Sequence, residues 1–335
     1  MSKKLMIFGG SGFVGGNMAK IAQQNGWEVY IADNRSHPDL QAEWWMVNIT
    51  DQDSVEKAIA VVNPTAVVNV AAIADIYQAE KEKEQAHEIN VDGARYVAES
   101  CAIKGIRYVF FSSDAVFDGE GSCYSEDDQP APVNYYCQTK LEAELAVLQA
   151  YQAAVVIRIS LVLGFPVTGG NSFFANLESK LKLGKEVLAP TYEIRTPVDV
   201  FTLAECVLEL CENSFSGVIH IGATDSISRY DLTQAVTRRM GYDEQLIKPQ
   251  AMPEAIPGRA PRHKNGIISV ARAQHILKTR LLSTEESIQR AFNDGNPRFV
   301  RDANPRFVRD GNPRFVGKDF KSTDQNKSAR RTHDD

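Results

Sequence analysis

The first 165 residues alternate short apolar runs with segments of helical spacing, and this alternation limits the possible folds more than any other feature. The apolar runs are 4–8, 27–33, 65–72, 107–113 and 153–164, and the helical segments are 13–26, 53–62, 88–105 and 135–152. Apolar runs without a polar alternation predict strands that are buried on both faces. The sequence therefore predicts a doubly wound parallel α/β sheet, with right-handed crossovers and helices on both sides.

The alternation of apolar runs and helical segments becomes less regular after residue 165. Helices are predicted at 172–185 and 228–241, a turn leading into a helix at 195–212, and a strand at 217–222. We expect residues 1–165 to form the nucleotide-binding domain, and 166–293 to form a smaller mixed lobe that returns some elements to the main sheet. Residues 294–335 form a third part, which begins with "DGNPRFVR", "DANPRFVR" and "DGNPRFVG". Eight residues are too few for a repeat that buries a core, so a disordered tail is expected, with binding of an acidic partner as the alternative.

Composition narrows the functional classes. A net charge of −6 gives no general attraction to nucleic acid or to an anionic membrane. The five cysteines have no paired spacing, and neither they nor the six histidines predict a metal site. "MSKKLMIFGG" contains too few apolar residues for a signal peptide or a membrane span, so a cytoplasmic location is expected.

The loop "GGSGFVG" places Gly9, Gly12 and Gly15 between a predicted strand and a predicted helix. Glycine lets the backbone turn tightly and approach a pyrophosphate, and it lets the helix pack closely on the strand. The N-terminus of the helix then offers free N–H groups to the phosphates. This context predicts a dinucleotide-binding Rossmann domain.

The end of the second strand bears on the choice of coenzyme. Asp33 can accept hydrogen bonds from an adenosine ribose diol and would repel a 2′-phosphate. Arg35 lies two residues further on and could instead pair with that phosphate. Together, Asp33 and Arg35 favour NAD as the coenzyme, with NADP as the alternative. Asn48 is a candidate for contact with the adenine, with an ordinary loop asparagine as the alternative.

The candidate catalytic residues lie in the segment "FFSSDAVFDGEGSCYSEDDQPAPVNYYCQTKLEAE" (110–144). Tyr136 and Lys140 are separated by one helical turn, so both side chains project from one face. A free tyrosine holds its proton with a pKa of about 10, and a nearby ammonium stabilises the phenolate. Ser113 ends a strand at the rim where doubly wound sheets bind ligands. Its hydroxyl can hold a carbonyl oxygen against the phenol.

Together, the glycine loop, "SSDAVFDG" (112–119) and the Tyr136-x-x-x-Lys140 spacing resemble the extended short-chain dehydrogenase/reductase superfamily. Within it, "VVNVAAIADIYQAE" (67–80), the 124–144 segment and "VVIRISLVLG" (155–164) are similar to the dTDP-4-dehydrorhamnose reductase family. The similarity covers residues 4 to about 165 and continues loosely to about 280. The tail from 294 lies outside it.

The resemblance implies a role for each matching position. Tyr136 would act as general acid toward a sugar ketone, Lys140 would hold the nicotinamide ribose and lower the tyrosine pKa, and Ser113 would polarise the carbonyl. Asn90 matches an asparagine that supports a helix bend and a water, with a helix-cap amide as the alternative. The implied cofactor contacts are Gly9, Ser11, Gly12, Phe13, Val14, Gly15, Asp33, Arg35, Asn48, Ala71, Ala72, Tyr136 and Lys140.

Substrate contacts are expected at Asp114 and, for a diphosphate, at Arg195, with Arg259 and Arg262 as further candidates, because guanidinium groups match phosphate oxygens. The chain departs from the reductase pattern at Ala115, Leu161 and Tyr77, which leaves the exact sugar open.

The expected activity is reduction of a nucleotide-linked keto-sugar by NAD(P)H. The Ala115-Val116 step also occurs in sugar epimerases, so epimerisation is an alternative. The family also resembles the regulatory subunit of methionine adenosyltransferase, which makes a non-catalytic binding protein the second alternative. A homodimer is expected from the resemblance, because members of this superfamily often dimerise through helices that flank the sheet.

Overall fold

The structure is a computed structural model that describes residues 3–35, 40, 42–168, 170–252 and 260–295. The described residues all fall in one compact unit, and the repeat segment lies outside the described residues except for Asp294 and Gly295, which end the helix Thr284–Gly295. Seven parallel strands form the main sheet in the order β11-β6-β5-β4-β1-β2-β3. They are β1 (Lys4–Phe8), β2 (Glu28–Asp33), β3 (Glu43–Met46), β4 (Ala66–Asn69), β5 (Arg107–Ser113), β6 (Val155–Ile159) and β11 (Gly217–Ile221). This confirms the predicted fold class.

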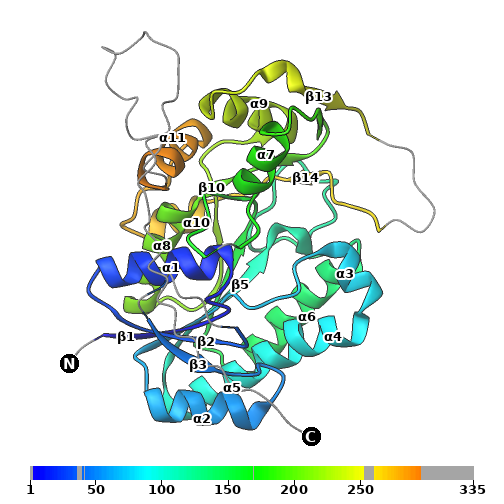
Figure 1. The fold of residues 1–335 in the computed structure, drawn as a ribbon. Coiled ribbons are helices and arrows are strands. Elements are labelled where there is room, and N and C mark those ends of the chain that lie inside the picture. The colour runs from blue at the N-terminus through cyan, green and yellow to red at the C-terminus, as the bar shows by residue number, and fades with distance from the viewer. Residues whose placement is uncertain (1–2, 36–39, 41, 169, 253–259, 296–335) are drawn as a thin grey trace, which may run out of the picture. The chain divides into compact units, whose positions relative to one another are not determined.

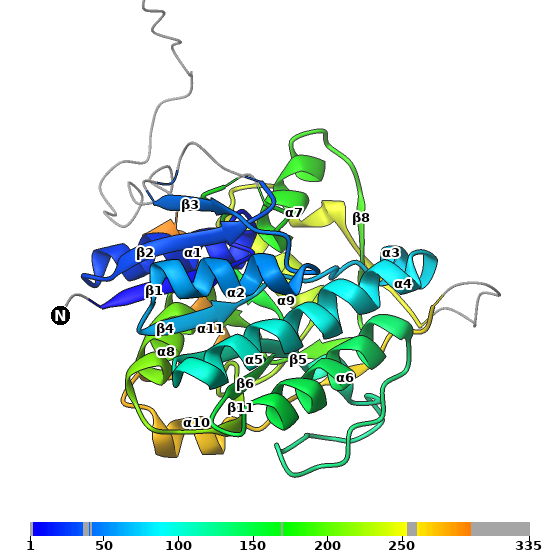
Figure 2. The same ribbon diagram turned by 90° about the horizontal axis from the view of Figure 1, so that it is seen from below.

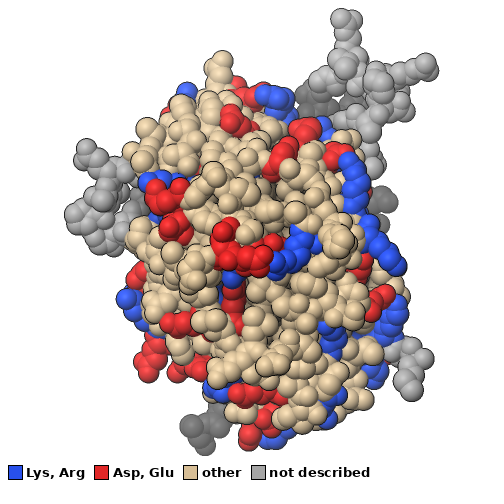
Figure 3. Space-filling model, turned by 180° about the vertical axis from the view of Figure 1, so that it is seen from behind, with Lys and Arg blue, Asp and Glu red and all other residues tan. Residues whose placement is uncertain are grey.

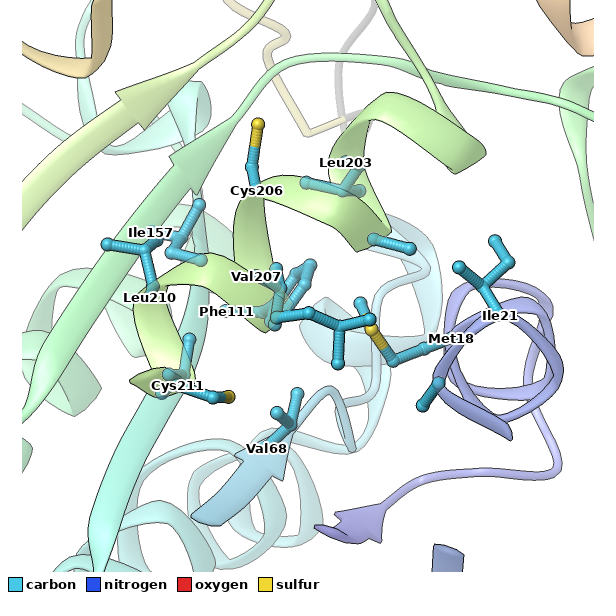
Figure 4. Packing of buried hydrophobic residues seen from close by; sticks show 14 of the residues in the cluster. Met18, Ile21, Val68, Phe111, Ile157, Leu203, Cys206, Val207, Leu210 and Cys211 are labelled. Carbon is cyan, nitrogen blue, oxygen red and sulfur yellow. The ribbon is translucent and has the colours of Figure 1, made fainter. Parts of the chain in front are cut away.

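Helices cover both faces of this sheet (Figures 1 and 2). Buried residues of α1 (Phe13–Gln24) and α8 (Val200–Glu212) pack on one face, with Met18, Leu203 and Val207 among them (Figure 4). On the other face lie α2 (Gln52–Val62), α5 (Gly93–Lys104) and α6 (Tyr135–Ala150). The sheet is therefore buried on both sides, which explains the continuous apolar runs in its strands.

The strand order reverses between β1 and β4. β2 and β3 extend from one side of β1, whereas β4, β5, β6 and β11 extend from the other. The loops that follow β1 and β4 consequently diverge at the carboxyl edge of the sheet. Such a topological switch point is where open α/β sheets bind their ligands.

A π-helical turn at Glu88–Asp92 (η1) joins α4 (Lys83–His87) to α5, within the segment predicted as one helix. α3 (Ile76–Lys81) and a 3-10 turn at Asp114–Val116 (η2) complete this part. β3 was not predicted. It is a four-residue edge strand, and its two tryptophans are only partly buried.

The later residues form small two- and three-stranded sheets and further helices. Their strands are β7 (Val162–Leu163), β8 (Val187–Pro190), β9 (Ile194–Arg195), β10 (Val198–Asp199), β12 (Ile227–Ser228), β13 (Ile247–Gln250) and β14 (Asn265–Gly266). Their helices are α7 (Phe173–Leu181), α9 (Arg229–Arg239), η3 (Glu244–Leu246), α10 (Ala271–Ile276) and α11 (Thr284–Gly295). A separate core around Phe174 and Phe292 supports α7, α9 and α11, whereas α10 packs against the core of the main sheet through Ala273. The boundary expected at residue 165 stays a prediction.

The helices and the surface charges bear on membrane and partner binding. Among the described residues, no helix combines the length and apolarity needed to cross a membrane. On the face shown in Figure 3, acidic and basic side chains lie in small interspersed groups.

Candidate active site

A cleft of about 450 Å3 lies at the switch point, between the loops that follow β1, β2 and β4. Most of the predicted cofactor residues line it: Gly9, Ser11, Gly12, Asp33, Arg35, Asn48, Ala71 and Ala72. The cleft is also lined by residues that were not predicted, among them Val47, Ile49, Ile73, Gln78, Gln85 and Ile89. Val47 and Ile49 follow the unpredicted strand β3, which is why the sequence pattern missed them.

A larger hollow of about 880 Å3 lies elsewhere, between α8 and the chain around residues 276–290. Its charged residues are largely paired with each other: Lys3 with Glu212, and Arg290 with Glu205. No residue of the predicted site lines it. We therefore place the site at the smaller cleft.

The glycine loop has the geometry of a phosphate cradle. Gly9 has a φ of 83°, and a Cβ at this position would lie 2.7 Å from the main-chain nitrogen of Ala71. A Cβ on Gly15 would lie 2.4 Å from the Gly9 oxygen, so both positions require glycine. Gly12 caps α1 without a side chain, which leaves the first N–H groups of the helix available to an anion.

Phe13 and Val14 have a different place from the cleft-lining residues. Phe13 is buried in the core between α1 and the sheet, and Val14 packs against the same core. Their side chains fix the start of α1. Any contact of these two residues with a phosphate would come from their main-chain N–H groups.

Asp33 joins the glycine loop to the end of β2. One carboxylate oxygen accepts a hydrogen bond from the Ser11 N–H (2.9 Å), and the other accepts one from the Arg35 N–H (3.2 Å). The Arg35 side chain is exposed beside it. Asn48 uses its amide oxygen to accept from Thr50. A carboxylate and a guanidinium thus share the rim of the cleft.

Tyr136 and Lys140 lie in the first two turns of α6, with Ser113 at the end of β5. Asn134 caps this helix, accepting from the Cys137 N–H (2.9 Å), which fixes where the helix begins. Tyr136 packs in one apolar cluster with Ile73, and Ile73 lines the cleft. The helix cap therefore places Tyr136 against Ile73, whereas Tyr136, Lys140 and Ser113 are not themselves among the residues that line the cleft.

The Tyr136 phenol holds its proton firmly. Burial raises its pKa well above the ordinary value, the Asp114 charge adds to this, and a hydrogen bond with Ser113 lowers it only in part. Lys140 is not among the groups that shift this pKa in the structure, so the expected lowering of the Tyr136 pKa by Lys140 stays a prediction. The Lys140 ammonium instead donates to the main-chain oxygen of Phe111 at 2.5 Å. Tyr136 is thus protonated at neutral pH, as a proton donor must be.

Lys140 is 4% exposed, and burial lowers its pKa to about 8, although the charge of Glu144 opposes this shift. Glu144 lies one turn further along α6 and pairs with Arg158 of β6 through two hydrogen bonds of 2.9 and 2.7 Å. The buried ion pair of Glu144 and Arg158 therefore lies one helical turn from Lys140.

The predicted substrate residues meet in a polar cluster next to Ser113. Asp114 is buried and accepts from Ser160 (2.7 Å), and it lies 3.9 Å from the Arg195 Nε. Arg195 donates to the main-chain oxygens of Ile194 and Lys264 (both 2.8 Å). Its guanidinium is thus mostly engaged within the protein, and its contact with a diphosphate stays a prediction.

Other arginines surround this cluster. Arg262 is exposed, with its guanidinium 5.7 Å from the ring centre of Tyr77. Arg259 lies outside the described residues. The sequence reasoning missed Arg229, whose guanidinium lies over the Phe173 ring. Burial lowers its pKa to about 10, with Arg195 and Arg262 contributing. Only its position at the start of a capped helix could have drawn attention to it.

Asn90 lies within the π-helical turn and not at a helix cap. Its amide exchanges hydrogen bonds with the main chain of Ile73 (2.8 and 3.1 Å) and donates to Thr139 (3.0 Å). It thereby joins the loop after β4 to α6, and so couples the cleft to the helix that carries Tyr136.

Comparison with known proteins agrees with this geometry. Residues 3–296 match the family described as RmlD substrate binding domain. A dTDP-4-dehydrorhamnose reductase of Mycobacterium tuberculosis is 30% identical over 276 residues, covering 80% of this chain and 85% of the relative. Methionine adenosyltransferase 2 subunit beta of Pongo abelii is 27% identical over 269 residues, covering 78% and 79%.

A solved structure has the same fold. It is dTDP-4-dehydrorhamnose reductase from Bacillus anthracis in complex with NADP, which has a TM-score of 0.77 and is 25% identical. The match covers 88% of this chain and all of that one, 100%.

Proposed function

Since this chain belongs to the RmlD substrate binding domain family, we propose that it is an NAD(P)-dependent reductase of a nucleotide-linked keto-sugar. The proposal is supported by Tyr136, which interacts with Ser113 and packs against the cleft-lining Ile73, and by a glycine loop that fits a dinucleotide. The reductases among the relatives support the same assignment.

The chain's own residues divide the work. A bound nicotinamide coenzyme supplies the hydride. Gly9, Gly12 and the start of α1 would hold its phosphates, and Asp33 and Arg35 would meet the adenosine ribose. Tyr136 delivers the proton to the carbonyl oxygen, since burial keeps it protonated until that oxygen becomes basic. The Lys140 charge stabilises the phenolate that remains.

The direct test is to mix the purified chain with NADH or NADPH and a panel of nucleoside-diphosphate 4-keto-sugars, following the loss of nicotinamide absorbance. We expect turnover of at least one keto-sugar. Failure with every ketone would contradict the proposal. NAD that stays bound through purification would then indicate the epimerase alternative.

A regulatory role is the second candidate, favoured by the similarity to methionine adenosyltransferase 2 subunit beta. The presence of Ser113, Tyr136 and Lys140 favours the enzyme, because assembly alone needs no phenol beside a cofactor cleft. Tight coenzyme binding without turnover of any ketone would support the regulatory role.

Coenzyme choice is expected to depend on Asp33. Replacing Asp33 by serine removes a charge that would repel a 2′-phosphate, so the ratio of kcat/KM for NADPH to that for NADH should rise by about tenfold or more. The matched variant Arg35→Ala should lower the same ratio, because it removes the phosphate's partner. An unchanged ratio in both variants would show that the ribose binds elsewhere.

The pH dependence is expected to follow Lys140. Its pKa of about 8 means that the ammonium is present below that pH and lost above it. We therefore expect kcat/KM for the coenzyme, which reports on the free enzyme, to fall by one proton's dependence above about pH 8. Lys140→Arg stays charged across this range, so its profile should lack the fall. A decline of the same shape in Lys140→Arg would assign the titration to another group.

A further inference from the structure

A loop of the later half of the chain reaches the catalytic serine through one buried carboxylate. Asp114 directly follows Ser113, and its Oδ1 accepts a hydrogen bond from the Ser113 hydroxyl at 3.0 Å. The other oxygen, Oδ2, faces the His263 Nε2 at 3.4 Å and accepts from the Ser160 hydroxyl. Asp114 and His263 are separated by 149 positions in the sequence. The carboxylate thus links two distant segments at the site.

The loop packs tightly against this carboxylate. A Cβ on Gly266 would lie 2.2 Å from the Asp114 Oδ2 and 3.0 Å from the His263 Nε2. His263 itself is only 8% exposed. A side chain at 266 would therefore displace the Asp114 carboxylate or the His263 ring, and the buried imidazole is held close to Asp114.

Asp114 keeps its charge in this buried setting. Burial acts to raise its pKa, but His263, Arg195 and Ser160 outweigh burial, and the pKa lies below its ordinary value. A charged acceptor holds a hydroxyl donor more firmly than a neutral one does. Serine has a single hydroxyl hydrogen, which points to Asp114 while the Tyr136 phenol carries its own proton, so the Asp114 bond sets the direction of the Ser113 hydroxyl.

From these contacts we propose that His263 is a positioning residue for catalysis. It holds Asp114 in place, and Asp114 in turn fixes the Ser113 hydroxyl against the Tyr136 phenol. This proposal rests on the proposed reductase function. It assigns to Asp114 the orientation of Ser113, in place of the substrate contact that the sequence predicts for Asp114.

The test is a double-mutant cycle on the full chain, with kcat measured for the keto-sugar that the wild type reduces. His263→Phe should lower kcat by about tenfold in the wild-type background, since a displaced catalytic group loses about this much or more. In a Ser113→Ala background the same change should cost less than about twofold, because its effect passes through Ser113. His263→Gln, which keeps a donor near Nε2, should recover most of the loss.

An equal loss in both backgrounds, or no loss in either, would overturn the proposal. KM for the coenzyme should stay near its wild-type value in His263→Phe, which separates positioning from a general loss of structure. Should His263→Phe not fold, His263→Asn takes its place in the cycle, since it is too short to reach Asp114.

A second readout does not need turnover, so failure of the proposed function would not hide the result. In chain labelled with 13C at the tyrosine ring carbon that bears the hydroxyl, the Tyr136 resonance is the one missing from Tyr136→Phe. It should shift in His263→Phe and in Ser113→Ala, and the double variant should match Ser113→Ala alone. An unmoved resonance in His263→Phe would contradict the proposal even if no ketone were reduced.

Discussion

Replacing Tyr136 by phenylalanine is expected to lower kcat by about a thousandfold, because the phenol is the proton donor to the carbonyl oxygen. Coenzyme binding should change little, since the glycine loop and Asp33 lie on other elements of the cleft. The measurement compares kcat with the coenzyme dissociation constant, obtained from nicotinamide fluorescence. A large loss in kcat alone would assign the phenol to the chemical step.

The neighbouring tyrosine provides a matched control. Tyr135 starts the same helix, and its ring contacts the Lys83 ammonium at 5.0 Å. Tyr135→Phe removes the same hydroxyl from a position that carries no proposed chemistry, so kcat should stay within about twofold of wild type. Comparable losses in the two variants would contradict the assignment of the proton donor to Tyr136.

Glu144→Leu is expected to destabilise the fold by about 3–5 kcal/mol. The side chains of Glu144 and Arg158 are 3% and 5% exposed, so the variant leaves a guanidinium buried without its partner. The Phe117 ring, 5.1 Å from that guanidinium, offers only partial compensation. The free energy of unfolding in denaturant, at neutral pH, measures the loss.

The double variant Glu144→Leu/Arg158→Leu is the control for this prediction. It removes both charges and leaves apolar groups, which is often neutral for a buried ion pair. We expect it to regain most of the stability that the single variant loses. If the double variant were the less stable of the two, the cost would come from packing and not from the unpaired charge.

The main sheet could be predicted from the sequence because its strands are buried on both faces and flanked by helical segments. The glycine loop, Tyr136 and Lys140 could also be predicted from the sequence, since each depends on spacing within one segment. β3 could not be predicted, because a four-residue edge strand with partly exposed tryptophans lacks a continuous apolar run. Strands of two residues, such as β9 and β14, carry too little pattern to be recognised at all.

Long-range polar contacts were beyond the reach of sequence patterns. Nothing in the residues around His263 indicates a contact with Asp114, because the pairing depends on the tertiary packing of Gly266. The same holds for Arg195, which the sequence offers as a phosphate ligand. The structure surrounds it with main-chain oxygens and Glu193.

The position of β11 has a consequence for how the chain folds during synthesis. The strand pairs with β6 only after residue 221 has left the ribosome, and α8 covers the sheet only a few residues earlier. Until then, the nascent first half exposes an unpaired apolar edge and an apolar face that α1 covers only in part. Such surfaces are prone to aggregation, so chaperone contact should be concentrated in this interval of translation. The order in which the elements emerge thus makes the second half of the chain a folding partner of the first.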